Sequence, residues 1–195
     1  MEGLQLVWTV VPAHSPAAYR ICPGCGQRQR FVCSEKFRVN AHQQRLDAWL
    51  IYKCCVCGDT WNCALFRRQR VQQIDPALFA ALQHNERRLA WRYAFDAALL
   101  KRNDAVIDPA VELAICGQVL EPSVLAQGAA TITLTAQYPL SVRLDALLAP
   151  QLGLSRSAFE RLIASGRITI APCGPLRRVL AAPVHICVRG ALSVT

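Results

Sequence analysis

Apolar and polar residues alternate in the first third of the chain. The alternation runs over residues 37–41, and a second apolar run follows over residues 46–52. A period of two is typical of a strand with one buried face. The pattern predicts a β-hairpin that turns at Gln43-Gln44, with residues 60–66 as a third strand.

The apolar spacing changes to a helical period in the middle of the chain. Asp75-Pro76 is typical of a helix start, since Asp caps the free backbone amides and Pro suits the first helical position. Leu78, Phe79 and Leu82 follow at helical spacing. A second helical stretch is predicted with Asn85 as its cap, and it ends at Asn103-Asp104. Two strands are then expected at residues 111–115 and 131–135, and residues 122–128 are expected to form the loop between them.

The last third predicts two short helices followed by strands. Leucines at helical spacing over 144–152 stop at Gly153, a usual residue just beyond a helix end. Ser155 or Ser157 caps the next helix, which stops at Gly166. The strands after these helices are expected at 167–170 and 184–188.

Composition and charge narrow the class of protein. The chain has 195 residues, of which 53 % are hydrophobic, so most of it is expected to be packed. No apolar run approaches the ~20 residues of a membrane helix, and the apolar residues 4–11 lack the preceding basic residues of a signal peptide. These observations predict a cytoplasmic protein without membrane contact, in which cysteines stay reduced.

The net charge of +9 is unevenly distributed. Residues 1–74 hold ten Lys or Arg against four acidic residues, residues 75–138 five against seven, and residues 139–195 seven against two. Two basic ends are compatible with a polyanionic partner such as nucleic acid. The alternative is that the charge only keeps the protein soluble.

Seven of the ten cysteines lie between positions 22 and 63. Cys22 and Cys25 form one CxxCG unit, and Cys54 and Cys57 form another, with 28 residues between the pairs. Each unit can make a tight turn that directs two sulfurs to one point, and two such turns complete the tetrahedral thiolate site that zinc prefers. The spacing predicts one structural Zn²⁺ in a zinc ribbon, and Cys55 could replace Cys54 as a ligand.

Other uses of these cysteines fit less well. A redox CxxC is expected singly and beside a βαβ unit, disulfides conflict with a reducing compartment, and an iron–sulfur cluster would use the same four ligands. The cysteines outside the two units are predicted to be small buried hydrophobic residues: Cys33, Cys63, Cys116, Cys173 and Cys187.

Several stretches carry a resemblance to a known family. Residues Phe37–Ala41, Leu46–Cys54 and Thr60–Asn62, together with the CPGCG unit, resemble the bacterial domain of unknown function 1062 family. The resemblance runs over nearly the whole chain. It implies a soluble bacterial protein and assigns no activity.

A second resemblance concerns residues 143–188. The stretches Arg143–Leu148, Leu154–Ser157 and Leu162–Ile168 are similar to the S4 RNA-binding domain, in which a helix pair on a small sheet presents basic residues to RNA. The sequence differs from the S4 family at residues 171–175, where these domains usually have an Asn-Gly-Lys turn. It implies RNA-binding positions at Arg143, Arg156 and Arg167, with further nearby basic residues at Arg161, Arg177 and Arg178.

These elements predict an α+β fold in three parts. Residues 1–74 would form the zinc ribbon with its hairpin, 75–138 a helical segment and strand pair, and 139–195 an S4-like helix pair with a small sheet. No P-loop, GxGxxG, HExxH or GxSxG motif is present, which favours a protein that is not an enzyme. The interpretation is a zinc-binding protein that associates with structured RNA or the ribosome. The alternatives are a protein-interaction scaffold and, less favoured, an enzyme that acts on RNA.

Overall fold

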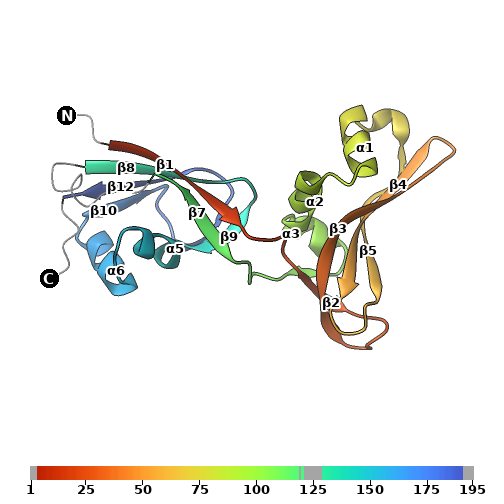
Figure 1. Cartoon of the computed structure of the whole chain (residues 1–195), viewed down its shortest axis with the longest axis horizontal. Helices are drawn as coiled ribbons and strands as arrows, with labels where there is room; N and C mark the ends of the chain where they lie inside the picture. Colours follow the sequence, from red (N-terminus) through yellow and green to blue (C-terminus); the bar gives the residue numbers. More distant parts are fainter. Residues whose placement is uncertain (1–3, 119, 121–128, 191–195) are drawn as a thin grey trace. The chain divides into compact units, whose positions relative to one another are not determined.

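The two ends of the chain fold together in one unit. The computed structural model, which describes residues 4–118, 120 and 129–190, divides into two compact units (Figure 1). Unit 1 combines Met1–Pro12 with Leu113–Thr195, and unit 2 consists of Ala13–Glu112. The chain therefore leaves unit 1 after its first strand and returns to it only at Leu113.

The predicted α+β class is wrong, because the protein is mostly β. Strands take 46 % and helices 24 % of the described residues. The strands form two five-stranded sheets and one two-stranded sheet. The C-terminal part does not form a separate unit of a helix pair and a small sheet. Two of its described strands join the sheet that contains the N-terminal strand, and two others pair with each other in the two-stranded sheet.

The sheet of unit 1 has the strand order β10-β12-β8-β1-β7. β1 pairs in parallel with β8, and the other neighbours pair antiparallel. Every second residue of β1 is buried, namely Leu6, Trp8 and Val10, so one face of this strand contributes to the core. The strand bounds are β1 Leu4–Pro12, β7 Leu113–Gly117, β8 Ala129–Ala136, β10 Ile168–Ala171 and β12 Val184–Arg189.

The two predicted C-terminal helices are present in unit 1. They are α5 (Leu144–Gln151) and α6 (Arg156–Ala164), which contact each other, and α6 also contacts β10. The Ser155 hydroxyl accepts a hydrogen bond from the Ala158 amide at 3.2 Å, so Ser155 rather than Ser157 caps α6. The two-stranded sheet joins β9 to β11, which are Leu140–Arg143 and Arg177–Leu180. The predicted loop 122–128 lies outside the described residues.

The sheet of unit 2 has the strand order β5-β4-β3-β2-β6. The predicted hairpin and third strand are confirmed as β3, β4 and β5. Gln43 and Gln44 form the hairpin turn with φ of +47° and +60°, which is typical of a two-residue turn that matches the strand twist. The strand bounds are β2 Ala18–Ile21, β3 Arg28–His42, β4 Arg45–Cys54, β5 Thr60–Arg70 and β6 Val106–Ile107.

The helical segment of unit 2 is divided into more pieces than predicted. The Asp75 carboxylate caps α1 by accepting from the Ala77 and Leu78 amides, as expected. Asn85 does not cap α2; its side-chain oxygen accepts from the Phe37 amide at 2.6 Å. The second predicted stretch is two helices, because Asp96 caps a separate α3. The helix bounds are η1 Val71–Gln73, α1 Pro76–Gln83, α2 Arg87–Ala94 and α3 Ala97–Arg102.

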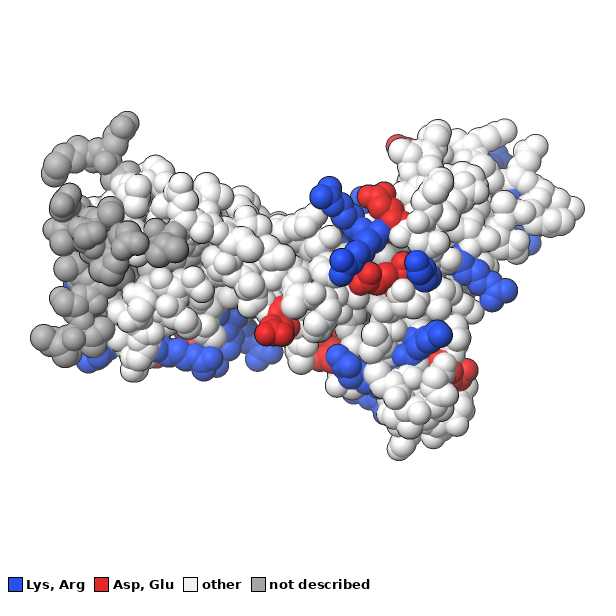
Figure 2. Space-filling view, in the orientation of Figure 1, with Lys and Arg blue, Asp and Glu red and all other residues white. Residues whose placement is uncertain are grey.

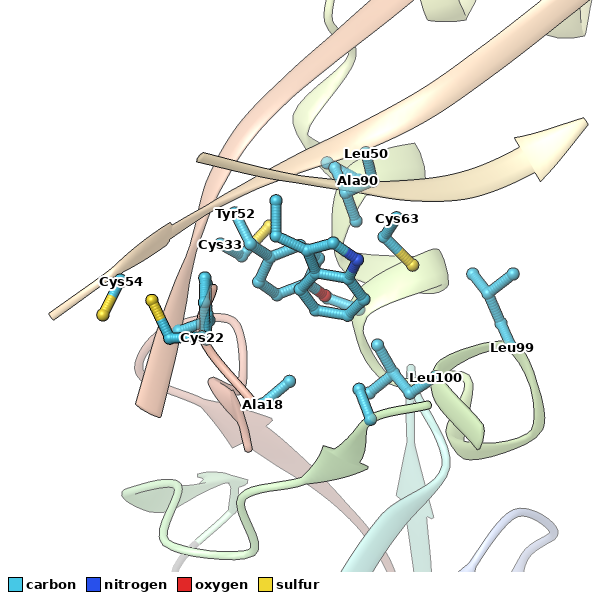
Figure 3. Packing of buried hydrophobic residues seen from close by; sticks show 14 residues of the cluster. Ala18, Cys22, Cys33, Leu50, Tyr52, Cys54, Cys63, Ala90, Leu99 and Leu100 are labelled. Atoms are coloured by element: carbon cyan, nitrogen blue, oxygen red, sulfur yellow. The ribbon is translucent and has the colours of Figure 1, made fainter. Parts of the chain in front are cut away.

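One face of the unit 2 sheet is buried in a core with α2 and α3. Leu50 and Tyr52 of β4 belong to this core, together with Ala90 of α2 and Leu99 and Leu100 of α3 (Figure 3). The Tyr52 and Trp61 rings pack with their centroids 4.8 Å apart. Because side chains alternate along a strand, the residues between the buried positions of β4 point to the opposite face.

Candidate metal centre

The two CxxCG units form two turns of the same shape. In the first, the Gly26 amide donates to the Cys22 carbonyl at 2.9 Å; in the second, the Gly58 amide donates to the Cys54 carbonyl at 3.0 Å. Gly26 and Gly58 have φ of +69° and +76°, values that a residue with a side chain adopts only at a cost. Glycine at these positions therefore allows each turn to form the hydrogen bond that brings its two cysteines close together.

Strand pairing brings the two turns together. The first turn connects β2 to β3, and the second connects β4 to β5. Since β3 pairs with both β2 and β4, the two turns lie at the same end of the sheet. The Cys55 amide donates to the Arg30 carbonyl at 2.9 Å, which attaches the second turn to β3. A Cβ added to Gly24 would lie 3.3 Å from the Cys57 sulfur, so the two turns are in close contact.

The four sulfurs are spaced as a metal ion requires. The Sγ atoms of Cys22 and Cys57 are 3.5 Å apart, those of Cys25 and Cys54 are 3.9 Å apart, and all four lie within 4.8 Å of one another. A tetrahedral thiolate site with zinc–sulfur bonds of about 2.3 Å places its sulfurs about 3.8 Å apart. The cluster of Cys22, Cys25, Cys54 and Cys57 can therefore hold one metal ion, and Cys55 is not part of it.

Of the four cysteines, Cys54 has surroundings that favour the thiolate. Backbone amides of Cys57 and Val56 donate toward the Cys54 sulfur and lower the pKa of this thiol to about 7, against the opposing effect of burial. The hydrogen bond with Cys57, followed by burial, raises the pKa of Cys25 to about 12. Burial raises the pKa of Cys22. Packing thiols this closely disfavours several negative charges unless a cation lies among them.

The remaining cysteines fall into two groups. Cys33 and Cys63 are buried in the core of unit 2, as predicted, and Cys187 is partly buried. Cys116 and Cys173 are exposed, so their prediction as buried residues was wrong. Within the part of the chain that the structure describes, no other group of three or more His, Cys, Asp or Glu side chains is close enough to hold an ion.

The six arginines implied by the S4 resemblance do not form one free group. Figure 2 shows Lys and Arg side chains along the edge of unit 1 where α5 and α6 lie. Arg156 and Arg161 are exposed on α6, and Arg177 on β11 is exposed opposite Arg143 on β9. Arg167 is only partly exposed, and its backbone carbonyl accepts from the Arg189 amide.

Arg143 and Arg178 are held by the protein itself. Arg143 donates to both carboxylate oxygens of Asp145 at 3.2 and 2.7 Å. The Asp145 side chain is fully buried, and the hydrogen bond from Arg143 lowers the pKa of this carboxyl. Arg178 donates to the carbonyls of Pro172 and Pro175 at 2.9 and 2.8 Å. These two guanidinium groups therefore stabilise local structure.

A pocket on the unit 2 sheet was not predicted from the sequence. It has a volume of about 460 Å³. Its lining residues are Arg38, Val39, Asn40, Trp49 and Asn62. The sequence did contain a sign of it, because Trp49 lies two residues after Asp47 and four before Lys53 and so shares the strand face of these two polar residues.

The comparison with known families decides the classification. The family described as "Protein of unknown function (DUF1062)" matches residues 39–172. The chain belongs to this family. The DUF1062 match includes Cys54 and Cys57 but begins after Cys22 and Cys25, so half of the metal cluster precedes the matched range. The predicted membership is thereby confirmed, whereas the S4 resemblance is not supported.

No curated protein and no solved structure matches the chain. None of the helices that the structure describes combines the length and the apolar character needed to cross a membrane.

Proposed function

We propose that the cysteine cluster holds one structural zinc ion and that the protein is a cytoplasmic binding protein rather than an enzyme. The observation that carries this proposal is the spacing of the four sulfurs. Four thiolates occupy every position of tetrahedral zinc, which leaves none for a substrate or an activated water. The ion joins two turns of one sheet, a structural role.

Elemental analysis of protein purified without added metal tests the identity of the ion. We expect one zinc per chain and a colourless protein. A brown protein that contains iron and sulfide would show that an iron–sulfur cluster occupies the site instead. A folded protein without any metal would refute a structural ion altogether.

We further propose that unit 1 binds structured RNA through its exposed arginines. The support is the gathering of basic side chains along the edge that includes α5 and α6. Arg143 and Arg178 are engaged within the protein, so the residues available for phosphates are Arg156, Arg161 and Arg177. Planar guanidinium groups suit phosphate oxygens, and structured RNA is recognised largely through its backbone.

Salt dependence tests this RNA proposal. If all three arginines contact phosphates, the logarithm of affinity for an RNA hairpin should fall with the logarithm of salt with a slope of about −2.7. This corresponds to about 40-fold weaker binding at 200 than at 50 mM salt. The combined change Arg156→Ala, Arg161→Ala and Arg177→Ala should remove this dependence, and Arg70→Ala in unit 2 serves as the control. Affinity that survives the triple change would refute the RNA proposal.

A protein partner is the second candidate for unit 1. Val7 on β1 is 62 % exposed, and it pairs with Thr133 of β8, which in turn pairs with His185 of β12. These side chains share one face of the sheet. An exposed apolar position on this face favours protein contact over RNA contact. Loss of protein association on Val7→Lys, with RNA binding absent, would favour this candidate.

A further inference from the structure

Trp49 lies on the outward face of the unit 2 sheet. Its strand neighbours Ala48 and Leu50 are fully buried against the core, so Trp49 points the other way. The other tryptophans, Trp8, Trp61 and Trp91, are only 2 %, 6 % and 8 % exposed, whereas Trp49 is partly exposed. Trp49 therefore does not pack in this core, and part of its aromatic ring is accessible on the outward face.

Polar side chains from the two neighbouring strands, β3 and β5, surround this indole. Arg38 on β3 lies directly opposite Trp49 on β4, with Asn40 two residues further along β3. Asn62 on β5 is opposite Ile51, the next outward residue of β4. Together with Val39 these residues line the 460 Å³ pocket, a volume within the usual range for small-molecule sites.

The side chains of this pocket are not used by the protein. Within the described ranges, Arg38, Asn40, Trp49 and Asn62 make no side-chain hydrogen bond, ion pair or ring contact. The carboxylate nearest in the pairing pattern, Asp47, already accepts from the Arg68 amide at 2.7 Å. The pocket lining therefore offers amide and guanidinium donors beside an aromatic ring, and no carboxylate is among its lining residues.

The other indoles of unit 2 show that Trp49 differs from them. The Arg20 guanidinium lies over the Trp61 ring, and that of Arg87 lies over the Trp91 ring, each 4.7 Å from the centroid. These cations cover aromatic faces and contribute to folding. Arg38 makes no such contact with Trp49 although the two residues are directly paired. The accessible surface of the Trp49 ring is thus left for a ligand.

We propose that this pocket binds a nucleobase that carries a phosphate. The base stacks on the Trp49 ring, the amides of Asn40 and Asn62 hydrogen-bond to its polar edge, and the Arg38 guanidinium binds the phosphate. Carboxamides suit this task because each offers both donors and an acceptor. This site lies in unit 2 and does not depend on the arginines of unit 1.

The base can come from a free nucleotide or from single-stranded nucleic acid. Lys53 separates the two sources, because it is exposed on the same strand and the same face, four residues and therefore about 13 Å from Trp49. A mononucleotide at Trp49 does not extend to Lys53, whereas the next phosphates of a strand do. Lys53→Ala should consequently weaken oligonucleotide binding and leave mononucleotide binding unchanged.

Tryptophan fluorescence provides the direct test, with the metal-loaded full-length protein. The probes are AMP, UMP, a ten-residue oligo(U) and a neutral oligosaccharide. Stacking of a base on the one partly exposed indole should quench the emission. Trp49→Ala should weaken binding, measured by calorimetry, by about 5-fold to about 150-fold, which is the effect of losing one stacked base. Arg38→Ala should weaken it as well, and Arg38→Lys should restore part of the affinity.

Matched variants separate binding from folding. Trp49→Phe keeps an aromatic ring and should retain most of the affinity while losing the quenching. Arg88→Ala is the control for Arg38→Ala, because Arg88 is exposed on α2, a helix that packs on the other face of the sheet. Binding that survives Trp49→Ala, binding of the neutral oligosaccharide in preference to the nucleotides, or no binding by any nucleotide probe would each overturn the proposal.

Discussion

Unit 2 and unit 1 connect distant parts of the chain by different means. In unit 2, two turns separated by 28 residues meet at a cysteine cluster, where a metal ion can join them. In unit 1, as far as the structure describes it, no such cluster exists, and the N-terminal strand joins the segment that begins at Leu113 through the parallel pairing of β1 with β8. In the first connection a metal ion can reinforce strand pairing, whereas the second depends on backbone hydrogen bonds and on the packing of Trp8 and its neighbours. The two units should therefore respond to different perturbations.

Metal removal should have the largest effect on stability, and this effect should be confined to unit 2. Structural zinc sites supply an apparent ~10–16 kcal/mol at neutral pH, as much as the whole stability of a small domain. Cys25→Ser or a strong chelator should therefore unfold unit 2. Hydrogen exchange read by mass spectrometry should show rapid exchange in β3 and β4, and unchanged protection in β8 and β12.

Cys55→Ser is the matched control for the metal experiment. Cys55 is exposed, adjacent to a ligand and outside the sulfur cluster, so its replacement should leave metal content and exchange unchanged. If Cys55→Ser released the metal, the ligand set would be misassigned. If unit 1 lost protection together with unit 2, the units would not be independent.

Unit 1 should be destabilised by any side chain added at Gly117. A Cβ at this position would lie 2.5 Å from a ring carbon of Trp8 and 2.7 Å from the Val7 carbonyl oxygen. The Trp8 ring is also held by its N–H, which donates to the Gln118 carbonyl at 2.8 Å. Gly117→Ala should therefore destabilise unit 1 by about 3 kcal/mol through overpacking.

Gly153→Ala distinguishes this clash from ordinary glycine effects. Gly153 has φ of +66° and nothing within 4 Å of an added Cβ, so the cost is backbone strain of about 1 kcal/mol. Thermal unfolding followed by near-ultraviolet circular dichroism measures both variants. Equal losses for the two glycines would mean that the Trp8 ring can move aside.

The Asp145 carboxyl should make the stability of unit 1 sensitive to acid. The hydrogen bond from Arg143 lowers the pKa of this fully buried group. A lowered pKa means that the stabilisation is complete above the unfolded value of about 3.9 and is lost as the pH falls through the lower folded value. Asp145→Asn should cost about 2 kcal/mol at neutral pH, since a charge-assisted hydrogen bond is lost.

The pH profile contains the control for this prediction. In the Asp145→Asn variant the exchange protection of unit 1 should fall less steeply below pH 4 than in the unchanged protein. Asp108 in unit 2 forms an ion pair with Arg30 at 2.8 Å. This pair is unchanged in the Asp145→Asn variant, so the exchange protection of unit 2 should depend on pH as it does in the unchanged protein. If the exchange protection of unit 1 fell equally steeply below pH 4 in both proteins, Asp145 would not be the cause of the acid sensitivity.

Local structure was predictable in both units because it depends on neighbouring residues. The hairpin turn at Gln43-Gln44, the Asp75 cap and the helix end before Gly153 all follow from side chains within a few positions. The four cysteines of the cluster were predictable for a similar reason, since their spacing requires only that two tight turns meet. The break between α2 and α3 was missed, because Asp96 competes locally as a cap within a continuous apolar pattern.

Long-range pairing was not predictable from these patterns. Residues 4–11 alternate in burial, but nothing in them indicates that their partners are β7 and β8, more than 100 positions away. The α+β prediction failed at this point, because the C-terminal helices were assigned a small sheet of their own. The pocket at Trp49 was missed because only the pairing of β3, β4 and β5 brings Arg38 and Asn62 to one side of the sheet.

Helix caps should produce the smallest effects and give the finest comparison of the units. The Asp75 carboxylate caps α1 in unit 2, and the Ser155 hydroxyl caps α6 in unit 1. Asp75→Ala and Ser155→Ala should each cost about 1 kcal/mol, because each leaves helix amides unpaired. Glu86→Ala is the control, since Glu86 stands at the cap position of α2 without a side-chain bond and should change stability little. Each cap variant should lower the protection of its own unit alone in hydrogen exchange. If either variant lowered protection equally in both units, the chain would unfold as one cooperative body, and the metal would stabilise unit 1 as well.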